Sequence, residues 1–224
     1  MMTPYYEHAG ITIYHGDCRD VLSLVRADAV LTDPPYGIYT GVNKRGFMAD
    51  RSDHEANEWD HRPDNDLIYS VAQFAPISVI WGFGYFADAL GCCVAPLVWD
   101  KQTGKNYFAD GELAWTSFKT GTLRIFRHQW CGAFKDSERG AKAVHPTQKP
   151  VALMKWCLGL CGEVRTVLDP FMGSGTTLVA AKLLGLKAIG IEIEERYCEI
   201  AAKRLAQDVL PLEPGAACGA GGEQ

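Results

Sequence analysis

A short apolar segment, residues 29–32, runs directly into two consecutive prolines, and this junction constrains the chain more than any other feature. Four apolar or β-branched residues bounded by turn formers are typical of a buried strand. Asp33-Pro34-Pro35-Tyr36 ends that strand, because proline fixes φ and supplies no backbone donor. The turn therefore offers acceptors, on Asp33 and Pro34, beside a flat Tyr36 ring. Such a set suits a planar group that carries an NH2, although an ordinary strand-ending turn is the structural alternative.

Strand-like and helix-like segments alternate along most of the chain. Residues 11–14 and 18–25 predict a strand and a short helix before the strand at 29–32, which together form a parallel βαβ unit. The other expected helices are 67–74, 85–90, 148–161, 176–184 and 194–207, and the other expected strands are 77–81, 94–99, 166–168 and 188–193. Residues 112–119 and 122–127 predict a β-hairpin. The expected fold class is α/β, a mostly parallel sheet with helices on both faces and a β-hairpin at one edge.

The 224 residues are enough for one complete α/β core, and a composition of 47% hydrophobic and 22% charged residues is typical of a globular domain. We expect a single domain over residues 1–207, with a long polar loop at 37–65. A disordered tail is expected at 208–224. No apolar run approaches the ~20 residues that a membrane span needs, and no signal-peptide core is present. A cytoplasmic protein without a membrane partner is therefore expected.

The cysteines and histidines do not form a recognisable metal site. Eight cysteines are scattered along the chain without a CxxC pair, which predicts reduced thiols. Cys157 and Cys161 are one helical turn apart, and His54 and His61 lie among carboxylates, but neither pair has a second pair at metal-ligand spacing. We therefore expect no metal.

The positive charge is concentrated in the middle of the chain. The net charge is −5, yet residues 101–149 contain nine Lys and Arg against four Asp and Glu. A nucleic-acid partner needs cations to meet its phosphates, and their distribution matters more than the total. A solvated charged face is the structural alternative.

The C-terminal third contains a strand, a glycine turn, a helix, a second strand and an acidic residue in succession. Gly173 and Gly175 allow the backbone to approach a ligand at the start of a helix. Glu192 follows Gly175 by 17 residues, where a carboxylate can accept both hydroxyls of a ribose. An adenosine-containing cofactor is therefore expected. Leu178 replaces the third glycine of the dinucleotide fingerprint, and no Lys follows Gly175 as in a P-loop, so phosphate-bearing cofactors are disfavoured.

The motifs, taken together, resemble those of a known enzyme family. The Phe171-x-Gly-x-Gly turn is similar to that of S-adenosylmethionine binders, and residues 33–36 resemble the catalytic motif of the amino-group DNA methyltransferases, which modify adenine N6 or cytosine N4. The acceptor turn comes first, the basic middle next and the glycine turn last, which resembles the permuted β class. The resemblance covers about residues 11–205.

The resemblance implies a catalytic domain that uses S-adenosyl-L-methionine and acts on a base flipped out of double-stranded DNA. The implied catalytic residues are Asp33, Pro34, Pro35 and Tyr36. The implied cofactor residues are Asp17, Asp33, Pro34, His145, Thr147, Gln148, Lys149, Asp169, Pro170, Phe171, Gly173, Ser174, Gly175, Thr176, Thr177, Glu192 and Ile193. Structural alternatives stay open for some of them: helix caps for Asp17, Thr176 and Thr177, and solvated surface for His145 and Lys149.

Asp33, in place of the Ser of most cytosine-N4 enzymes, favours adenine N6 as the target. The region at 101–147 resembles a target-recognition region but is short for an independent DNA reader, so specificity could depend on the loop at 37–65 or on a homodimer partner. Such a compact enzyme would suit a phage or mobile element, and the family resemblance also implies a restriction-modification setting. The open alternatives are cytosine-N4 methylation, methylation of RNA or of a protein glutamine, and a catalytically silent nucleic-acid-binding subunit.

Overall fold

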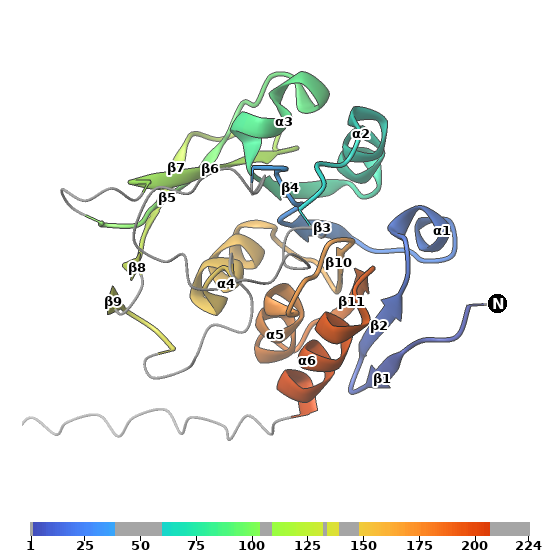
Figure 1. Ribbon diagram of the computed structural model, residues 1–224. Coiled ribbons are helices and arrows are strands. Elements are labelled where there is room, and N and C mark those ends of the chain that lie inside the picture. The colour runs from blue at the N-terminus through green and yellow to red at the C-terminus, as the bar shows by residue number, and fades with distance from the viewer. Residues whose placement is uncertain (1, 39–59, 104–108, 132–133, 139–147, 207–224) are drawn as a thin grey trace, which may run out of the picture.

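The computed structural model describes residues 2–38, 60–103, 109–131, 134–138 and 148–206 (Figure 1). Within them the strands are β1 (Tyr6–His8), β2 (Ile11–His15), β3 (Ala29–Thr32), β4 (Ile77–Trp81), β5 (Leu97–Asp100), β6 (Gly111–Thr116), β7 (Arg124–Arg127), β8 (Trp130–Cys131), β9 (Phe134–Lys135), β10 (Thr166–Asp169) and β11 (Lys187–Glu192). The helices are α1 (Cys18–Leu22), α2 (Asn65–Gln73), α3 (Phe83–Leu90), α4 (Val151–Leu160), α5 (Thr176–Leu183) and α6 (Glu195–Ala206). None of these helices has both the length and the apolar character needed to cross a membrane.

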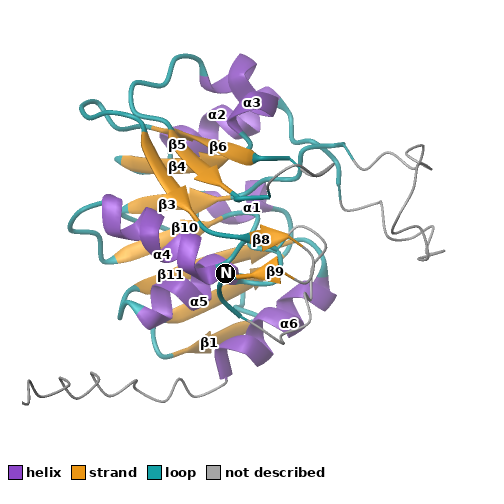
Figure 2. Cartoon of the chain, turned by 90° about the vertical axis from the view of Figure 1, so that its left-hand side faces the viewer, coloured by secondary structure: helices purple, strands orange, loops and turns teal. Residues whose placement is uncertain are grey.

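The described strands form a sheet in the order β1-β2-β11-β10-β3-β4-β6-β5-β7, with β8 and β9 paired separately. Five neighbouring strands, β2, β11, β10, β3 and β4, run parallel. Helices α1, α2 and α3 pack on one face, and α4, α5 and α6 pack on the other (Figure 2). The mostly parallel α/β sheet with helices on both faces is therefore confirmed.

Strand β3 illustrates how the sequence produces this sandwich. Ala29 and Leu31 belong to the core cluster beneath α4, α5 and α6, whereas Val30 belongs to the opposite cluster with α1, α2 and α3. Side chains alternate across a strand, and both faces of a parallel sheet are covered by helices, so an uninterrupted apolar run is needed. All four residues of β3 are buried.

The predicted hairpin between residues 112–119 and 122–127 is wrong. Strand β5 lies between β6 and β7, antiparallel to the first and parallel to the second. Leu97 and Trp99 of β5 are fully buried, so this strand takes a central position, while the largely exposed β7 forms the edge. The edge hairpin of the sheet is instead β1–β2, which turns through Ala9 and Gly10 at positive φ.

The expected helices and core strands are present with shifted ends, and β1, β8 and β9 were not predicted. The helix expected at 148–161 begins at Val151, because Pro150 occupies its N-cap. The division into a domain, a loop at 37–65, a recognition region at 101–147 and a tail at 208–224 stays a prediction. Residues 39–59, 104–108, 132–133, 139–147 and 207–224 lie outside the described residues.

Strands β10 and β3 are parallel, but the strands that follow them in the chain are added to opposite sides of the sheet. From β10 the chain passes through α5 to β11 on one side, and from β3 it passes through α2 to β4 on the other side and the opposite face. Such a switch point leaves a crevice at the carboxyl ends of the two strands. The ends of β3 and β10 are joined there by a hydrogen bond of 2.6 Å that the Thr32 hydroxyl donates to Asp169 Oδ1.

Candidate active site

A cavity of about 1510 Å³ opens at the carboxyl ends of the parallel strands. Strands β2, β11, β10, β3 and β4 are neighbours in that order, and at this edge they lead to Asp17, Glu192, Asp169, Asp33 and Gly82, all of which line the cavity. Five segments distant in sequence therefore meet in one place.

Most of the predicted site residues line this cavity. They are Asp17, Asp33, Pro34, Pro35, Tyr36, Gln148, Lys149, Asp169, Pro170, Phe171, Gly173, Ser174, Thr176, Thr177, Glu192 and Ile193. Gly175 does not line it and has a packing role instead. At its φ of +79°, a Cβ on Gly175 would lie 2.8 Å from the Cβ of Ala201 in α6. His145 and Thr147 lie outside the described residues.

Asp33 is held by two donors. The Tyr36 hydroxyl donates to Asp33 Oδ1 at 2.5 Å, and the Lys149 ammonium donates to Asp33 Oδ2 at 2.6 Å. Burial raises the pKa of Asp33 and the neighbouring ammonium opposes this rise. The Lys149 side chain is only 5% exposed, so the alternative of a solvated surface lysine is wrong. Its ammonium lies against the acceptor turn.

The Tyr36 ring occupies a pocket formed by the start of α3. It stacks on Tyr85 with a centroid distance of 4.7 Å and meets the edge of Phe86 at 6.0 Å. Gly82 sits at φ +78°, and a Cβ there would lie 2.2 Å from Tyr36 Cε1. Gly82 directly follows the strand predicted at 77–81, and the structure makes it the residue that admits the Tyr36 ring.

Asp169 and Glu192 are acids with little access to water. Burial raises the pKa of Asp169 to about 6, although the Thr32 hydroxyl and the Phe171 N–H stabilise its charged form. Burial raises the pKa of Glu192 to about 7. Glu192 accepts the Gly173 N–H at 2.9 Å on one oxygen and the Glu194 N–H at 2.9 Å on the other. Each oxygen retains a lone pair for a ligand hydroxyl.

Arg204, which the sequence analysis did not indicate, supports the glycine turn through hydrogen bonds. The Arg204 guanidinium of α6 donates to the Ser174 carbonyl at 2.6 Å and to the Ser174 hydroxyl at 3.1 Å. It also reaches the Thr176 hydroxyl at 3.3 Å. An arginine near a helix end has no sequence pattern that would reveal this contact.

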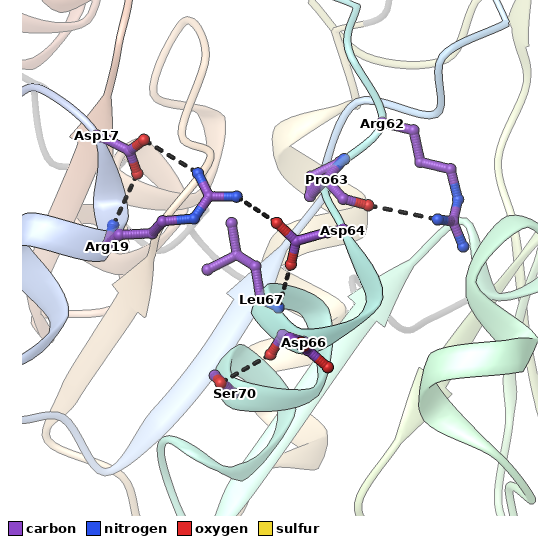
Figure 3. A network of polar contacts seen from close by, with 8 residues as sticks. All are labelled: Asp17, Arg19, Arg62, Pro63, Asp64, Asp66, Leu67 and Ser70. Atoms are coloured by element: carbon purple, nitrogen blue, oxygen red, sulfur yellow. Dashed lines mark hydrogen bonds and ion pairs between the residues drawn. The ribbon is translucent and has the colours of Figure 1, made fainter.

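Asp17 is a helix cap, which was the structural alternative to its predicted cofactor role. It caps α1 by accepting the Arg19 N–H at 2.8 Å, and it pairs with the Arg19 guanidinium at 3.0 Å. The same guanidinium reaches Asp64 at 2.6 Å, and Asp64 in turn caps α2 through the Leu67 N–H (Figure 3). The network ties α1 to α2 while Asp17 still faces the cavity.

The charged and hydrogen-bonding side chains of the cavity fit an adenosine cofactor that carries no phosphate. Every Lys and Arg of the described cavity lining is ion-paired with a carboxylate: these are Arg19, Arg62, Lys101 and Lys149. The described lining therefore has no uncommitted cation to pair with a phosphate, whereas Glu192 offers the acceptors that a ribose needs. S-adenosylmethionine meets both conditions.

A family model described as DNA methylase matches residues 76–203 of this chain. The chain belongs to this family. The methyltransferase is 29% identical to the type II methyltransferase M2.LlaDCHI of Lactococcus lactis subsp. cremoris, over 92% of this chain and 93% of the relative. It is 28% identical to the DNA adenine methyltransferase YhdJ of Escherichia coli strain K12, over 87% and 82%. The solved complex of M1.HpyAVI with SAM has 26% identity and a TM-score of 0.58, covering 88% of this chain and 100% of that one.

The protein is thus an S-adenosylmethionine-dependent DNA methyltransferase of the amino-group class, and the sequence-based assignment of family and cofactor is confirmed. The cationic surface of this methyltransferase is smaller than its sequence indicated. Lys101 and Lys149 are neutralised by Glu112 and Asp33. Lys105, Arg139 and Lys142 lie outside the described residues, so the contacts with DNA phosphates stay a prediction.

Proposed function

We propose that this methyltransferase transfers the methyl group of S-adenosylmethionine to the exocyclic N6 of adenine in DNA. The observation that carries the proposal is that Asp33 and Pro34 line the same cavity as the glycine turn and Glu192. The acceptors for an amino group and the proposed binding site for adenosine thus lie in one cavity. A relative named as a DNA adenine methyltransferase supports the choice of base.

The acceptor turn supplies the catalysis. The lone pair of adenine N6 is delocalised into the ring, which makes the nitrogen a poor nucleophile. When the Asp33 carboxylate and the Pro34 carbonyl each accept one N–H, the nitrogen becomes more tetrahedral and its lone pair localises. Positive charge that develops on the nitrogen is stabilised by acceptors already in place. Bound S-adenosylmethionine supplies an electrophilic methyl group on a sulfonium, and Asp33 can then take the proton that the nitrogen loses.

The target base has to leave the duplex. The Asp33 side chain is 18% exposed and lies inside the cavity, where a stacked and paired base cannot bring its amino group. Base flipping delivers a base to such a pocket. Tyr36 presents its ring beside Asp33 as a stacking surface, with the far side of that ring supported by Tyr85.

The cofactor is proposed to bind along the glycine turn. The Gly173–Thr177 backbone would face the methionine and adenosine, Glu192 would accept the ribose hydroxyls, and Ile193, which is largely exposed beside it, would cover the adenine. Asp17, Gln148, Asp169, Pro170 and Phe171 would complete the enclosure. Lys149 is proposed to act on Asp33 and not on the cofactor, because its ammonium is committed to that carboxylate.

The test measures which base carries the methyl group. The protein is incubated with methyl-labelled S-adenosylmethionine and unmethylated genomic DNA, which is then digested to nucleosides and separated. N6-methyladenine is expected from the wild type and not from Asp33→Ala, while the matched variant Asp66→Ala, exposed on α2, should keep its activity. Label in N4-methylcytosine would keep the mechanism and change the base.

Label absent from DNA would refute the proposal and direct attention to RNA or to a protein glutamine. Sequencing the labelled DNA would give the recognition site. A homodimer, a phage origin and a partner restriction enzyme stay predictions, and the oligomeric state is checked by light scattering with and without DNA.

A further inference from the structure

The Lys149 ammonium lies between two carboxylates. Its Nζ is 2.6 Å from Asp33 Oδ2 and 2.9 Å from Glu112 Oε2. Glu112 belongs to β6, whose first residues meet the carboxyl end of β4 because the two strands are antiparallel. Nothing in the sequence pattern singled out this glutamate.

Glu112 has a second cationic partner. Lys101, at the end of the neighbouring strand β5, pairs with Glu112 Oε1. The charges therefore alternate along a chain of four side chains, in the order Lys101, Glu112, Lys149 and Asp33. At that end the Tyr36 hydroxyl lies 3.2 Å from the Lys149 ammonium, and the buried Asp169 is a second acid whose charge is repelled by that of Asp33. The Trp81 ring lies about 6.0 Å from Nζ, and the Cys157 thiol is a further titratable neighbour.

This arrangement addresses a conflict at Asp33. The carboxylate has to be ionised in order to accept an N–H of the target base, and burial alone favours its neutral form. Lys149 corrects this, but its ammonium already bonds to Asp33 Oδ2 and the Tyr36 hydroxyl to Oδ1, so a base has to compete with these two donors for the carboxylate. If Asp33 were the only partner of Lys149, a base that displaced the ammonium would leave a buried, unpaired charge, which is strongly unfavourable.

Glu112 removes that penalty. An ammonium that is already 2.9 Å from the Glu112 carboxylate keeps an ionic partner when the base takes its place on Asp33. Lys101 in turn keeps Glu112 ionised: the two neighbouring lysines bring the pKa of Glu112 down to about 2 despite its burial.

We propose that Glu112 is a positioning residue for methyl transfer, which shares the Lys149 ammonium with Asp33 and so allows Asp33 to release that ammonium and accept the amino group of the target base. The inference rests on the proposed function, because it assumes that Asp33 is the acceptor.

The experiment compares the pH profiles of kcat/KM for DNA. Glu112→Gln is nearly isosteric and removes one negative charge near Asp33. The pKa of Asp33 then falls, because a like charge has been removed while Lys149 is kept. The acid limb should move to lower pH by about one unit, and KM for DNA should rise several-fold as Lys149 closes more tightly on Asp33. Lys149→Met should move the acid limb in the opposite direction, to higher pH.

Glu163→Gln is the matched control, since Glu163 is exposed in a turn far from this cluster, and its profile should coincide with that of the wild type. Thermal melting and cofactor binding show whether each variant is folded. If Lys149→Met does not fold, the test depends only on the direction in which the acid limb of Glu112→Gln moves. An acid limb that does not move in Glu112→Gln, or moves upward, would overturn the inference while the wild type remains active. A wild type that transfers no methyl group to DNA would remove the proposed function and this inference together.

Discussion

Gly82→Ala tests whether the position of the Tyr36 ring determines the rate of the reaction. Gly82 is the N-cap of α3, with φ +78° and ψ +28° in the left-handed region. An alanine there costs about 1–2 kcal/mol in backbone strain. The new Cβ would also lie 2.2 Å from Tyr36 Cε1 and 2.7 Å from Cζ.

The ring has to retreat by at least ~1.2 Å to reach an ordinary contact distance of about 3.4 Å, and a misplacement of about 1 Å can already lower a rate by about 100-fold. Tyr36 cannot move independently, because its ring packs on Tyr85 and its hydroxyl holds Asp33 Oδ1. We therefore expect kcat of Gly82→Ala to fall by about two orders of magnitude. Binding of S-adenosylmethionine should change little, since the clash lies at the acceptor turn.

Gly185→Ala is the matched control. Gly185 follows α5 at φ +70° with open space where a Cβ would be, so it shows the backbone strain without the clash. Both variants should lose stability in urea unfolding, and only Gly82→Ala should lose turnover in single-turnover methyl transfer. Equal kcat values for the two variants would refute the argument that the position of the Tyr36 ring determines the rate.

Two further predictions concern the cofactor half of the cavity. The pKa of Glu192 in the folded protein, about 7, lies above its unfolded value, so the stability that its protonated form contributes is complete below about pH 4.3 and is lost as the pH rises through 7. Urea unfolding at pH 4.5 and 7.5 should show a smaller loss of stability for Glu192→Gln than for the wild type. Arg204→Met releases Ser174 and Thr176, and calorimetry should show several-fold weaker binding of S-adenosylmethionine with unchanged binding of DNA.

Each of these predictions has its own control. Asp169, whose pKa is raised to about 6, adds a slope of the same sign, so Glu192→Gln should reduce the pH dependence without abolishing it. An unchanged slope would mean that Glu192 is not desolvated. Arg196→Met removes an exposed arginine of the same helix, and equal cofactor affinities for the Arg196 and Arg204 variants would show that Arg204 does not support the glycine turn.

Local patterns predicted the parts of the site that belong to single segments. An apolar strand followed by Asp33-Pro34 has a restricted backbone whatever surrounds it, and so has a strand followed by Gly173 and Gly175. Glu192 was predictable for the same reason, since it ends a strand at a fixed interval after the glycine turn. The order of these motifs along the chain was enough to indicate the family and its cofactor.

The predicted hairpin failed because adjacency in sequence was taken for adjacency in the sheet. Residues 112–119 and 122–127 have suitable strand patterns, but β5 competes for the same edge of β6 and buries Leu97 and Trp99 in doing so. The free energy gained by this burial depends on packing across the whole core, so no short stretch of the sequence predicts it.

The sequence by itself therefore determined the strands, the turns that end them and the chemistry that those turns can support. Only the tertiary structure decided which side chains act on Asp33. Lys149 precedes α4, Glu112 lies in β6 and Gly82 ends β4, and they meet because the strand order brings these elements to one edge of the sheet. The physical reason is the range of the interactions: backbone preferences are local, whereas ion pairs and ring packing depend on elements that come together only when the core forms.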